Sequence, residues 1–382
     1  MKLLICVLTF ILFSLLPLSV SSASAHRYFM QPKDLTCPMK RVAHWQMEHF
    51  TYRTEGNLHD YGLGAWTNSV LYLGMLEWAE IADEPEPYLT WLMNLGEETE
   101  WRIPANFANS PRYSYYHADE LCVGQFYLEM STIYKDSNMR SAAQQRVDWI
   151  MENPADSSMH HRNKQSWTWC DALFMAPPLY AHLGQLTGNP AYLVYMHQNF
   201  LRTYVHLYDR DDHLFFRDDS YLDKREVNGE KVFWGRGNAW ALAGIANILK
   251  RLPPESDIRP FYEKLFVELA TRLSQLQSND GFWHASLLDP DSYPSPETSA
   301  TALITYGLAY GINNNLLNAS TYRPVVQKAW EAMVSAIDED GKIGWVQPIG
   351  ADPKKVSRDM TAVYGAGAFL LAGAEILKLT KP

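Results

Sequence analysis

The chain has 382 residues, of which 47% are hydrophobic and 13% aromatic, and its formal net charge is −10. This acidic balance argues against nucleic acid or an anionic membrane surface as a partner, although a small anionic ligand needs only local cations. With four cysteines in the whole chain, no disulfide framework is implied, and a large hydrophobic core must hold the fold.

The first 25 residues have the pattern of a signal peptide. Met1-Lys2 supplies a charge, Leu3 to about Leu18 is an apolar run, and Ala23-Ser24-Ala25 is a small-x-small cleavage site. No later stretch approaches the 18 or so uninterrupted apolar residues that a membrane span needs. We therefore expect an exported protein, periplasmic or secreted, whose mature part is a single domain of residues 26–382.

Six stretches share one character: helical runs rich in Gly, Ala, Ser and aromatic residues, each with polar residues at its N-terminal end. Their starts lie 52 to 67 residues apart, and such self-similarity indicates a repeated supersecondary unit. The six stretches are Tyr61 to Ile81, Tyr116 to Tyr134, Thr168 to Thr187, Gly235 to Leu252, Glu297 to Ile312 and Asp359 to Leu379.

A second, amphipathic helix is predicted ahead of each of these stretches. In Pro260 to Ala270, apolar residues recur at helical spacing while Glu263, Lys264 and Glu268 face elsewhere, which is typical of a surface helix. The predicted surface helices are about Cys37 to Phe50, Pro87 to Glu98, Met139 to Glu152, Pro190 to Tyr208, Ile258 to Gln277 and Tyr322 to Ile337.

This alternation determines the predicted architecture. Helices that are apolar all round are buried, whereas half-polar helices face solvent. The pattern therefore predicts an all-α fold, an (α/α)6 barrel in which six inner helices are wrapped by six outer ones. An open α-solenoid fits the same repeat, but its terminal units should be polar caps. Because the last stretch, Met360 to Leu379, is apolar throughout, the closed barrel is favoured.

The stretch Ser166 to Pro178 places one carboxylate, Asp171, between a pair of tryptophans and a run of apolar residues. Full burial raises the pKa of a carboxyl group by up to roughly 3–5 units, which lets it hold a proton near neutral pH and donate it. The alternative is an aspartate that caps its helix through backbone N–H groups. By itself, the stretch leaves both interpretations open.

In a closed barrel the N-terminal ends of the inner helices converge on one mouth. There they bring together Asp119 and Asp171, a pairing that resembles the carboxylates of glycoside hydrolysis. Aromatic faces and hydrogen-bonding side chains around a cleft are what a sugar ring needs, although any single tryptophan is as readily explained by core packing. The further candidates at this mouth are Tyr61, Asn68, His117, Trp169, Trp234, Arg236, Asn238 and Trp240.

No metal ion or cofactor is predicted. His160-His161, and His117 with Asp119, lack the spacing of a helical metal-binding pair. Gly235-Arg236-Gly237 is a fragment of the dinucleotide fingerprint, and no strand is predicted before it.

Three motifs resemble, in order and spacing, those of the unsaturated rhamnogalacturonyl hydrolases of glycoside hydrolase family 105. They are Trp169 to Pro178, Trp234 to Trp240 and Glu297 to Ala302. The similarity runs from about Cys37 to the C-terminus. Members of that family have (α/α)6 barrels, and the family is related to the unsaturated glucuronyl hydrolases of family 88.

The resemblance implies hydration of a vinyl ether and not displacement at the anomeric carbon. The expected substrate is an oligosaccharide with the 4,5-unsaturated uronyl end that a polysaccharide lyase leaves. Asp171 would protonate C4 and assist water at C5, and Asp119 would bind ring hydroxyls. Trp234 and Trp240 would pack on the sugar, and Arg236 is our choice for the substrate carboxylate because a guanidinium pairs with it bidentately.

One departure from the family pattern concerns the substrate. Members acting on rhamnogalacturonan tend to have a histidine after a Leu-Phe-aromatic run, where this chain has Arg217. The added charge can favour a different sugar next to the unsaturated unit. An unsaturated glucuronyl hydrolase for another polysaccharide and a non-catalytic sugar-binding toroid remain alternatives. A monomer or weak homo-oligomer is expected.

Overall fold

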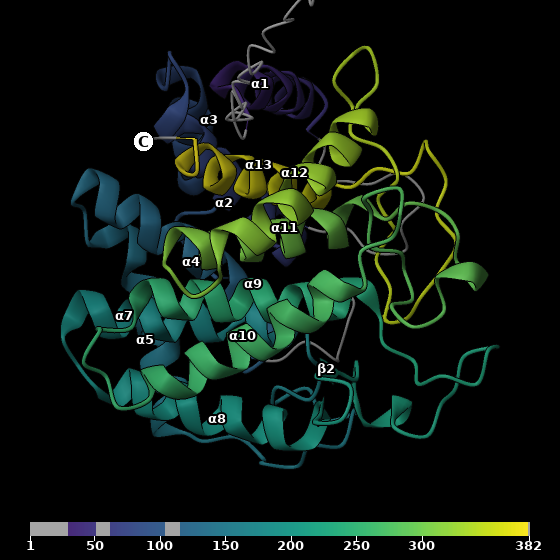
Figure 1. Cartoon of the computed structure of the whole chain (residues 1–382). Coiled ribbons are helices and arrows are strands. Elements are labelled where there is room, and N and C mark those ends of the chain that lie inside the picture. The colour runs from purple at the N-terminus through teal and green to yellow at the C-terminus, as the bar shows by residue number, and fades with distance from the viewer. Residues whose placement is uncertain (1–29, 51–61, 104–114, 381–382) are drawn as a thin grey trace, which may run out of the picture.

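The computed structural model describes residues 30–50, 62–103 and 115–380, which are mostly helical (Figure 1). The contacts between the helices arrange them in an inner and an outer ring. The inner ring consists of α2 (Trp66–Ile81), α4 (Ala118–Tyr134), α6 (Ala172–Met175) with α7 (Pro177–Thr187), α9 (Gly235–Arg251), α11 (Thr298–Asn313) and α13 (Val363–Lys378). The outer ring consists of α1 (Pro32–Glu48), α3 (Glu86–Glu98), α5 (Asn138–Glu152), α8 (Ala191–Leu207), α10 (Arg259–Gln275) and α12 (Ala319–Ser335). The predicted (α/α)6 barrel is confirmed.

The ring closes through contact between its last and first inner helices. Helix α13 packs along α2, and glycines permit the close approach, because a Cβ atom on Gly74 would lie 2.3 Å from the carbonyl oxygen of Gly367. Outer helices pack mainly on the inner helix that precedes them, and α1, the first helix, packs on α13, the last. The two ends of the described chain thus complete the sixth pair of helices.

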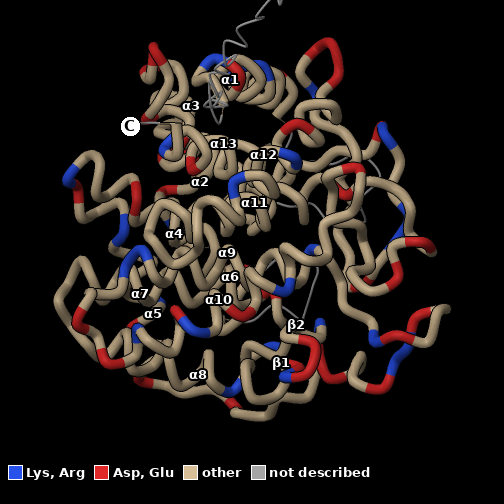
Figure 2. Tube along the Cα trace, in the orientation of Figure 1, with Lys and Arg blue, Asp and Glu red and all other residues tan. Residues whose placement is uncertain are grey.

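The two rings differ in polarity as predicted. Every residue of α11 from Thr298 to Ile312 is buried, and none of its residues is charged. Figure 2 shows Lys, Arg, Asp and Glu concentrated on outer helices and connecting loops, while α11 and most of α13 are drawn without charge. Burial of the inner ring therefore follows directly from its composition. Within the described residues, no helix has the length and apolar character required to cross a bilayer.

The third inner helix is interrupted, whereas the sequence predicts one continuous run from Thr168 to Thr187. Pro177 and Pro178 supply no backbone N–H, so carbonyls one turn earlier lose their helical partners. The side-chain amide of Gln125 in α4 supplies a donor to one of them, the carbonyl oxygen of Phe174 at 2.9 Å, and also to that of Met175 at 3.1 Å. The break leaves α6 as a single short turn directly after Asp171.

Candidate active site

Two carboxyl groups lie at the mouth formed by the N-terminal ends of the inner helices. Asp119 is in the first turn of α4, and Asp171 directly precedes α6. Their side chains are 15% and 12% exposed, respectively. Asp171 makes no capping hydrogen bond with its side chain, so the helix-cap interpretation of this residue is wrong. Its Oδ2 atom instead lies near Cys170 Sγ, at 3.6 Å, and the guanidinium group of Arg217.

The protonation of both carboxyl groups is shifted by their surroundings. Burial, followed by the charge of Asp171, raises the pKa of Asp119 to about 7. Burial also raises the pKa of Asp171, against the opposing effects of the Arg217 and Arg236 guanidinium groups. Because neighbouring carboxylates resist double ionisation, Asp119 keeps its proton up to nearly neutral pH. The mouth therefore contains two buried carboxyl groups that bind a proton more tightly than a free aspartate does.

Arg217 places a positive charge beside this pair. Its Nε atom lies 3.8 Å from Asp171 Oδ2 and has no hydrogen-bond partner among the described residues, while another guanidinium nitrogen pairs with Asp218. Arg217 follows the two-stranded hairpin of β1 (Tyr208–Asp209) and β2 (Leu214–Phe215). The backbone N–H of Cys170 donates a hydrogen bond to the carbonyl oxygen of Arg217 at 2.9 Å. The arginine that departs from the family pattern is thus fixed next to Asp171, and its side chain is 20% exposed.

Trp169 and His117 form an aromatic wall beside the carboxyl groups, with ring centroids 4.9 Å apart. Nδ1 of His117 accepts a hydrogen bond from the backbone N–H of Asp119 at 3.2 Å. Burial, and secondarily the charge of Lys164 and nearby arginines, lowers the pKa of His117 well below its ordinary value. The imidazole is therefore neutral, which suits a hydrogen bond to a sugar hydroxyl.

Sequence reasoning missed Lys164, a second cation at this site. Its Nζ atom lies 4.8 Å from the centroid of the Trp169 ring, and its charge interacts with those of Asp119 and Asp171. Burial and the charge of Arg217 lower the pKa of Lys164. The one available signal was its position shortly before the Trp-rich stretch, in a loop whose path the sequence does not reveal.

Arg236 differs from the sequence-based expectation. Its side chain is buried, with 1% exposure, and it donates to the backbone carbonyl oxygens of Gln347 and Pro348. The guanidinium carbon also lies 4.7 Å from the centroid of the Trp234 ring and 5.1 Å from that of Tyr364. In this structure Arg236 therefore holds the segment around Gln347 against α9 and α13, and the proposed partner for a substrate carboxylate shifts to Arg217.

The two tryptophans expected to pack on the sugar are buried as well. Trp240 is 1% exposed and packs between Trp66 and Phe174. Trp234 is 2% exposed, and its indole N–H donates to the side chain of Gln347 at 3.1 Å. Trp234, directly before α9, and Trp240, within α9, are therefore part of the core and not of the exposed surface of the mouth.

The two candidate asparagines bond to backbone groups. Asn238 exchanges hydrogen bonds with both the N–H and the carbonyl of Phe215, at 2.7 and 3.0 Å, and so fixes the hairpin that carries Arg217. Asn68 donates to the carbonyl oxygen of Gly62 at 3.1 Å. Tyr61, the remaining candidate, lies outside the described residues.

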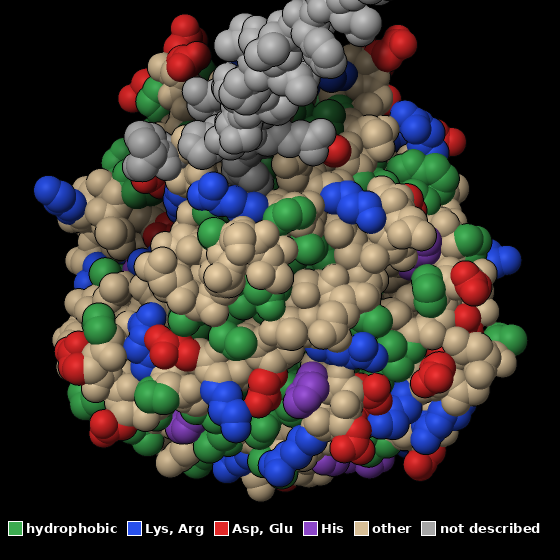
Figure 3. All heavy atoms as spheres, viewed as in Figure 1, with side chains coloured by type: hydrophobic (Ala, Val, Ile, Leu, Met, Phe, Trp, Pro, Cys, Tyr) green, Lys and Arg blue, Asp and Glu red, His purple; other side chains and the backbone are tan. Residues whose placement is uncertain are grey.

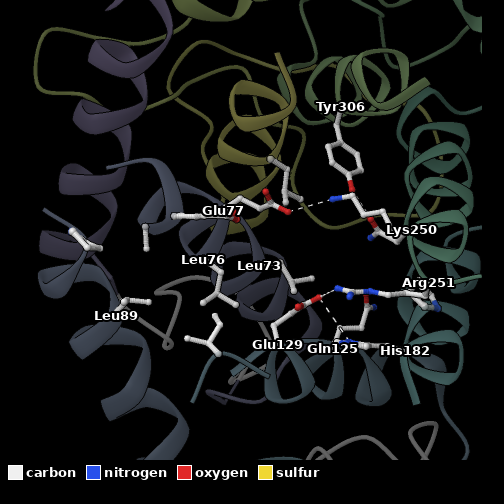
Figure 4. Close-up of a pocket in the computed structure, with 17 residues that line it drawn as sticks. Leu73, Leu76, Glu77, Leu89, Gln125, Glu129, His182, Lys250, Arg251 and Tyr306 are labelled. Atoms are coloured by element: carbon white, nitrogen blue, oxygen red, sulfur yellow. Dashed lines mark hydrogen bonds and ion pairs between the residues drawn. The ribbon is translucent and has the colours of Figure 1, made fainter. Parts of the chain in front are cut away.

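A cavity of about 480 Å³ lies at the opposite end of the inner ring, among the C-terminal halves of its helices (Figure 4). Its charged side chains pair with one another: Lys250 Nζ lies 3.2 Å from Glu77 Oε1, and Arg251 pairs with Glu129. Against the effect of burial, the charges of nearby lysines lower the pKa of Glu77 to about 2. A carboxylate held ionised in this way cannot donate a proton near neutral pH, so the mouth with Asp119 and Asp171 remains the candidate active site.

Comparison with known proteins identifies the family of this chain. Residues 38–380 match the family model described as Glycosyl Hydrolase Family 88. An unsaturated 3S-rhamnoglycuronyl hydrolase from Formosa agariphila is 35% identical over 337 residues, which cover 82% of this chain and 84% of that protein.

Solved structures are similar to this chain in both sequence and fold. A glycosyl hydrolase family 88 structure from Bacteroides vulgatus has 32% identity and a TM-score of 0.81, covering 91% of this chain and 99% of that one. A chain described as a polysaccharide lyase has 32% identity and a TM-score of 0.80, covering 91% and 98%. The predicted resemblance to the related families 105 and 88 is confirmed, and the chain belongs to Glycosyl Hydrolase Family 88.

Proposed function

We propose that this glycoside hydrolase removes a 4,5-unsaturated uronyl residue from the non-reducing end of oligosaccharides produced by a polysaccharide lyase. The observation that carries the proposal is the presence of two buried carboxyl groups with raised pKa, Asp119 and Asp171, the second of them beside Arg217. Hydration of a vinyl ether needs an acid for one carbon and a base for water at the other, and the uronyl carboxylate needs a cation.

The reaction follows from these roles. Asp171 protonates C4 of the double bond, and water adds at C5 as its proton returns to the carboxylate of Asp171. The resulting hemiketal opens, and the neighbouring sugar leaves from C1. Asp119 binds ring hydroxyls, and burial together with the charge of Asp171 keeps it largely protonated below about pH 7.

The sugar next to the uronyl unit is proposed to be rhamnose. The name of the Formosa agariphila relative specifies a 3S-rhamnoglycuronyl substrate, and this chain carries two cations, Arg217 and Lys164, near its carboxyl pair. Arg217 suits the uronyl carboxylate, and Lys164 suits a second anionic group such as a sulfate ester on the rhamnose.

The test is to incubate the full chain with unsaturated disaccharides and follow the ultraviolet absorbance of their conjugated C4=C5 bond. The substrates are uronyl-rhamnose with and without a sulfate, and an unsaturated glycosaminoglycan disaccharide. We expect the absorbance to disappear fastest with a rhamnose-linked substrate. A lyase would instead raise the absorbance of an intact polysaccharide, and a sugar-binding protein would leave both unchanged. Failure to consume any unsaturated substrate would overturn the proposal.

We propose further that residues 1–25, which lie outside the described residues, are a signal peptide and that the mature enzyme is periplasmic or secreted. It acts as a monomer or weak homo-oligomer, without a nucleic-acid or membrane partner and without a cofactor for the reaction. The net charge of −10 supports this setting, as do the interspersed acidic and basic side chains on the face drawn in Figure 3. N-terminal sequencing of the exported protein tests the cleavage site.

A further inference from the structure

Two histidines and an aspartate meet close to Arg217. His160 and His161 lie in the loop between α5 and α6, and Asp219 begins the short helix η1 (Asp219–Tyr221). One ligand atom from each side chain lies within 4.8 Å of the other two. His161 Nδ1 is 2.6 Å from Asp219 Oδ1, and the backbone N–H of His161 donates to the same oxygen at 3.1 Å. The two imidazole rings stack with centroids 4.3 Å apart.

We propose that His160, His161 and Asp219 bind a divalent transition metal ion, with zinc as the model. Imidazole nitrogen and carboxylate oxygen are zinc ligands at about 2.0–2.2 Å, and three such ligands with a water complete a tetrahedral site. At those bond lengths the ligand atoms lie about 3.3 Å apart. Small side-chain rotations reach this spacing from the observed positions, and a histidine that binds through a protonated nitrogen releases that proton.

The sequence alone hides this group. Adjacent histidines lack the spacing at which one helix presents two ligands, and the third ligand, Asp219, follows His161 by 58 residues. The hairpin of β1 and β2 brings it back, because the carbonyl of Arg217 accepts a hydrogen bond from the stretch that follows the histidine loop.

A bound ion would join the two segments that carry the cations of the candidate active site. Lys164 follows His161 by three residues in the same loop, and Arg217 precedes Asp219 by two. Asp218, between them, already pairs with Arg217. The ion is therefore assigned a positioning role, in which it orders both cations without contacting the reacting atoms.

The experiment uses untagged full-length protein, stripped of metal with a chelator and titrated with Zn²⁺ by calorimetry and with Co²⁺ by absorbance. His160→Ala, His161→Ala and Asp219→Asn remove one ligand each. His49→Ala is the matched control, because His49 is an exposed histidine at the C-terminal cap of α1. We expect one ion per chain in the wild type and the control, and at least tenfold weaker binding in the three ligand variants.

Melting temperature provides a second readout that does not depend on activity. At a Zn²⁺ concentration of about 100 times Kd, the folding equilibrium constant of the wild type should rise about 100-fold, with little change for His160→Ala. His160 is exposed, so its replacement leaves a folded protein even if His161 and Asp219 also stabilise the loop. The proposal would be overturned if the wild type did not bind one Zn²⁺ ion per chain, or if His160→Ala and Asp219→Asn bound Zn²⁺ as tightly as the wild type. In either case the contact between His161 and Asp219 would be only a hydrogen bond between two loops.

Discussion

Replacing Asp119 with asparagine should stabilise the protein at alkaline pH and leave its stability nearly unchanged in acid. In the unfolded chain an aspartate titrates near ~3.9, whereas burial and the charge of Asp171 raise the pKa of Asp119 to about 7 in the folded protein. The folded state therefore binds the proton more tightly than the unfolded state. It follows that the wild type loses stability as pH rises from about 4 to about 7, and that the neutral asparagine of the variant avoids this loss.

The size of the effect follows from the same shift. A difference of about 3 pKa units at about 1.36 kcal/mol each gives roughly 4 kcal/mol as an upper limit. The side chain is 15% exposed, so solvent relaxation lowers the expected gain to roughly 1–4 kcal/mol above pH 7.

Urea unfolding of the wild type and Asp119→Asn between pH 4 and pH 8.5 measures this gain directly. The difference in unfolding free energy should grow through this interval and level off above about pH 7. The exposed Asp83 supplies a control, Asp83→Asn, for which we expect no such pH-dependent difference. A difference between wild type and Asp119→Asn that is the same at every pH would refute the reasoning about the carboxyl pair.

Three further substitutions test the roles of single residues. Asp171→Asn should lower kcat by about 10²–10⁴-fold with an unchanged fold by circular dichroism; retention of more than a few per cent of activity would exclude it as the acid. Arg217→Ala should raise KM about tenfold or more, because its guanidinium group lies beside Asp171 and is partly exposed, whereas Arg210→Ala, an exposed arginine in the turn of the same hairpin, should not. Arg236→Ala should lower the unfolding free energy by about 3 kcal/mol, since its bonds to two carbonyl oxygens are lost; an unchanged melting temperature with a raised KM would instead restore its predicted substrate role.

The fold could be predicted from the sequence because its two rings are chemically distinct. Helix α11 carries no charge and is buried from Thr298 to Ile312, whereas α10 presents Glu263, Lys264 and Glu268 on one side. That contrast in polarity is local and periodic, so it can be recognised in the sequence without knowledge of tertiary contacts. The pairing of α1 with α13 is not local, and no pattern within either helix indicated it.

The break between α6 and α7 was accessible in principle. Pro177 and Pro178 removed two helical donors, and a continuous helix through them was a poor prediction. What the sequence could not supply was the compensating partner, because Gln125 lies 49 residues before Phe174. Gln125 donates to the freed carbonyl of Phe174 and to that of Met175, at the break that follows the short turn after Asp171.

The two arginines show why site residues are harder to predict than helices. Both act electrostatically on Asp171, and the family-like motif around Arg236 made it the more attractive partner for a substrate carboxylate. Its two terminal nitrogens donate instead to the carbonyl oxygens of Gln347 and Pro348, 111 and 112 positions further along the chain, and its side chain is 1% exposed. The side chain of Arg217, by contrast, is 20% exposed. A bound carboxylate at Arg217 adds negative charge beside Asp171 and raises the pKa of that carboxyl group further. Substrate binding at Arg217 thus favours the protonated acid that the first step of the reaction requires, a coupling that Arg236, with a side chain that is only 1% exposed, does not provide.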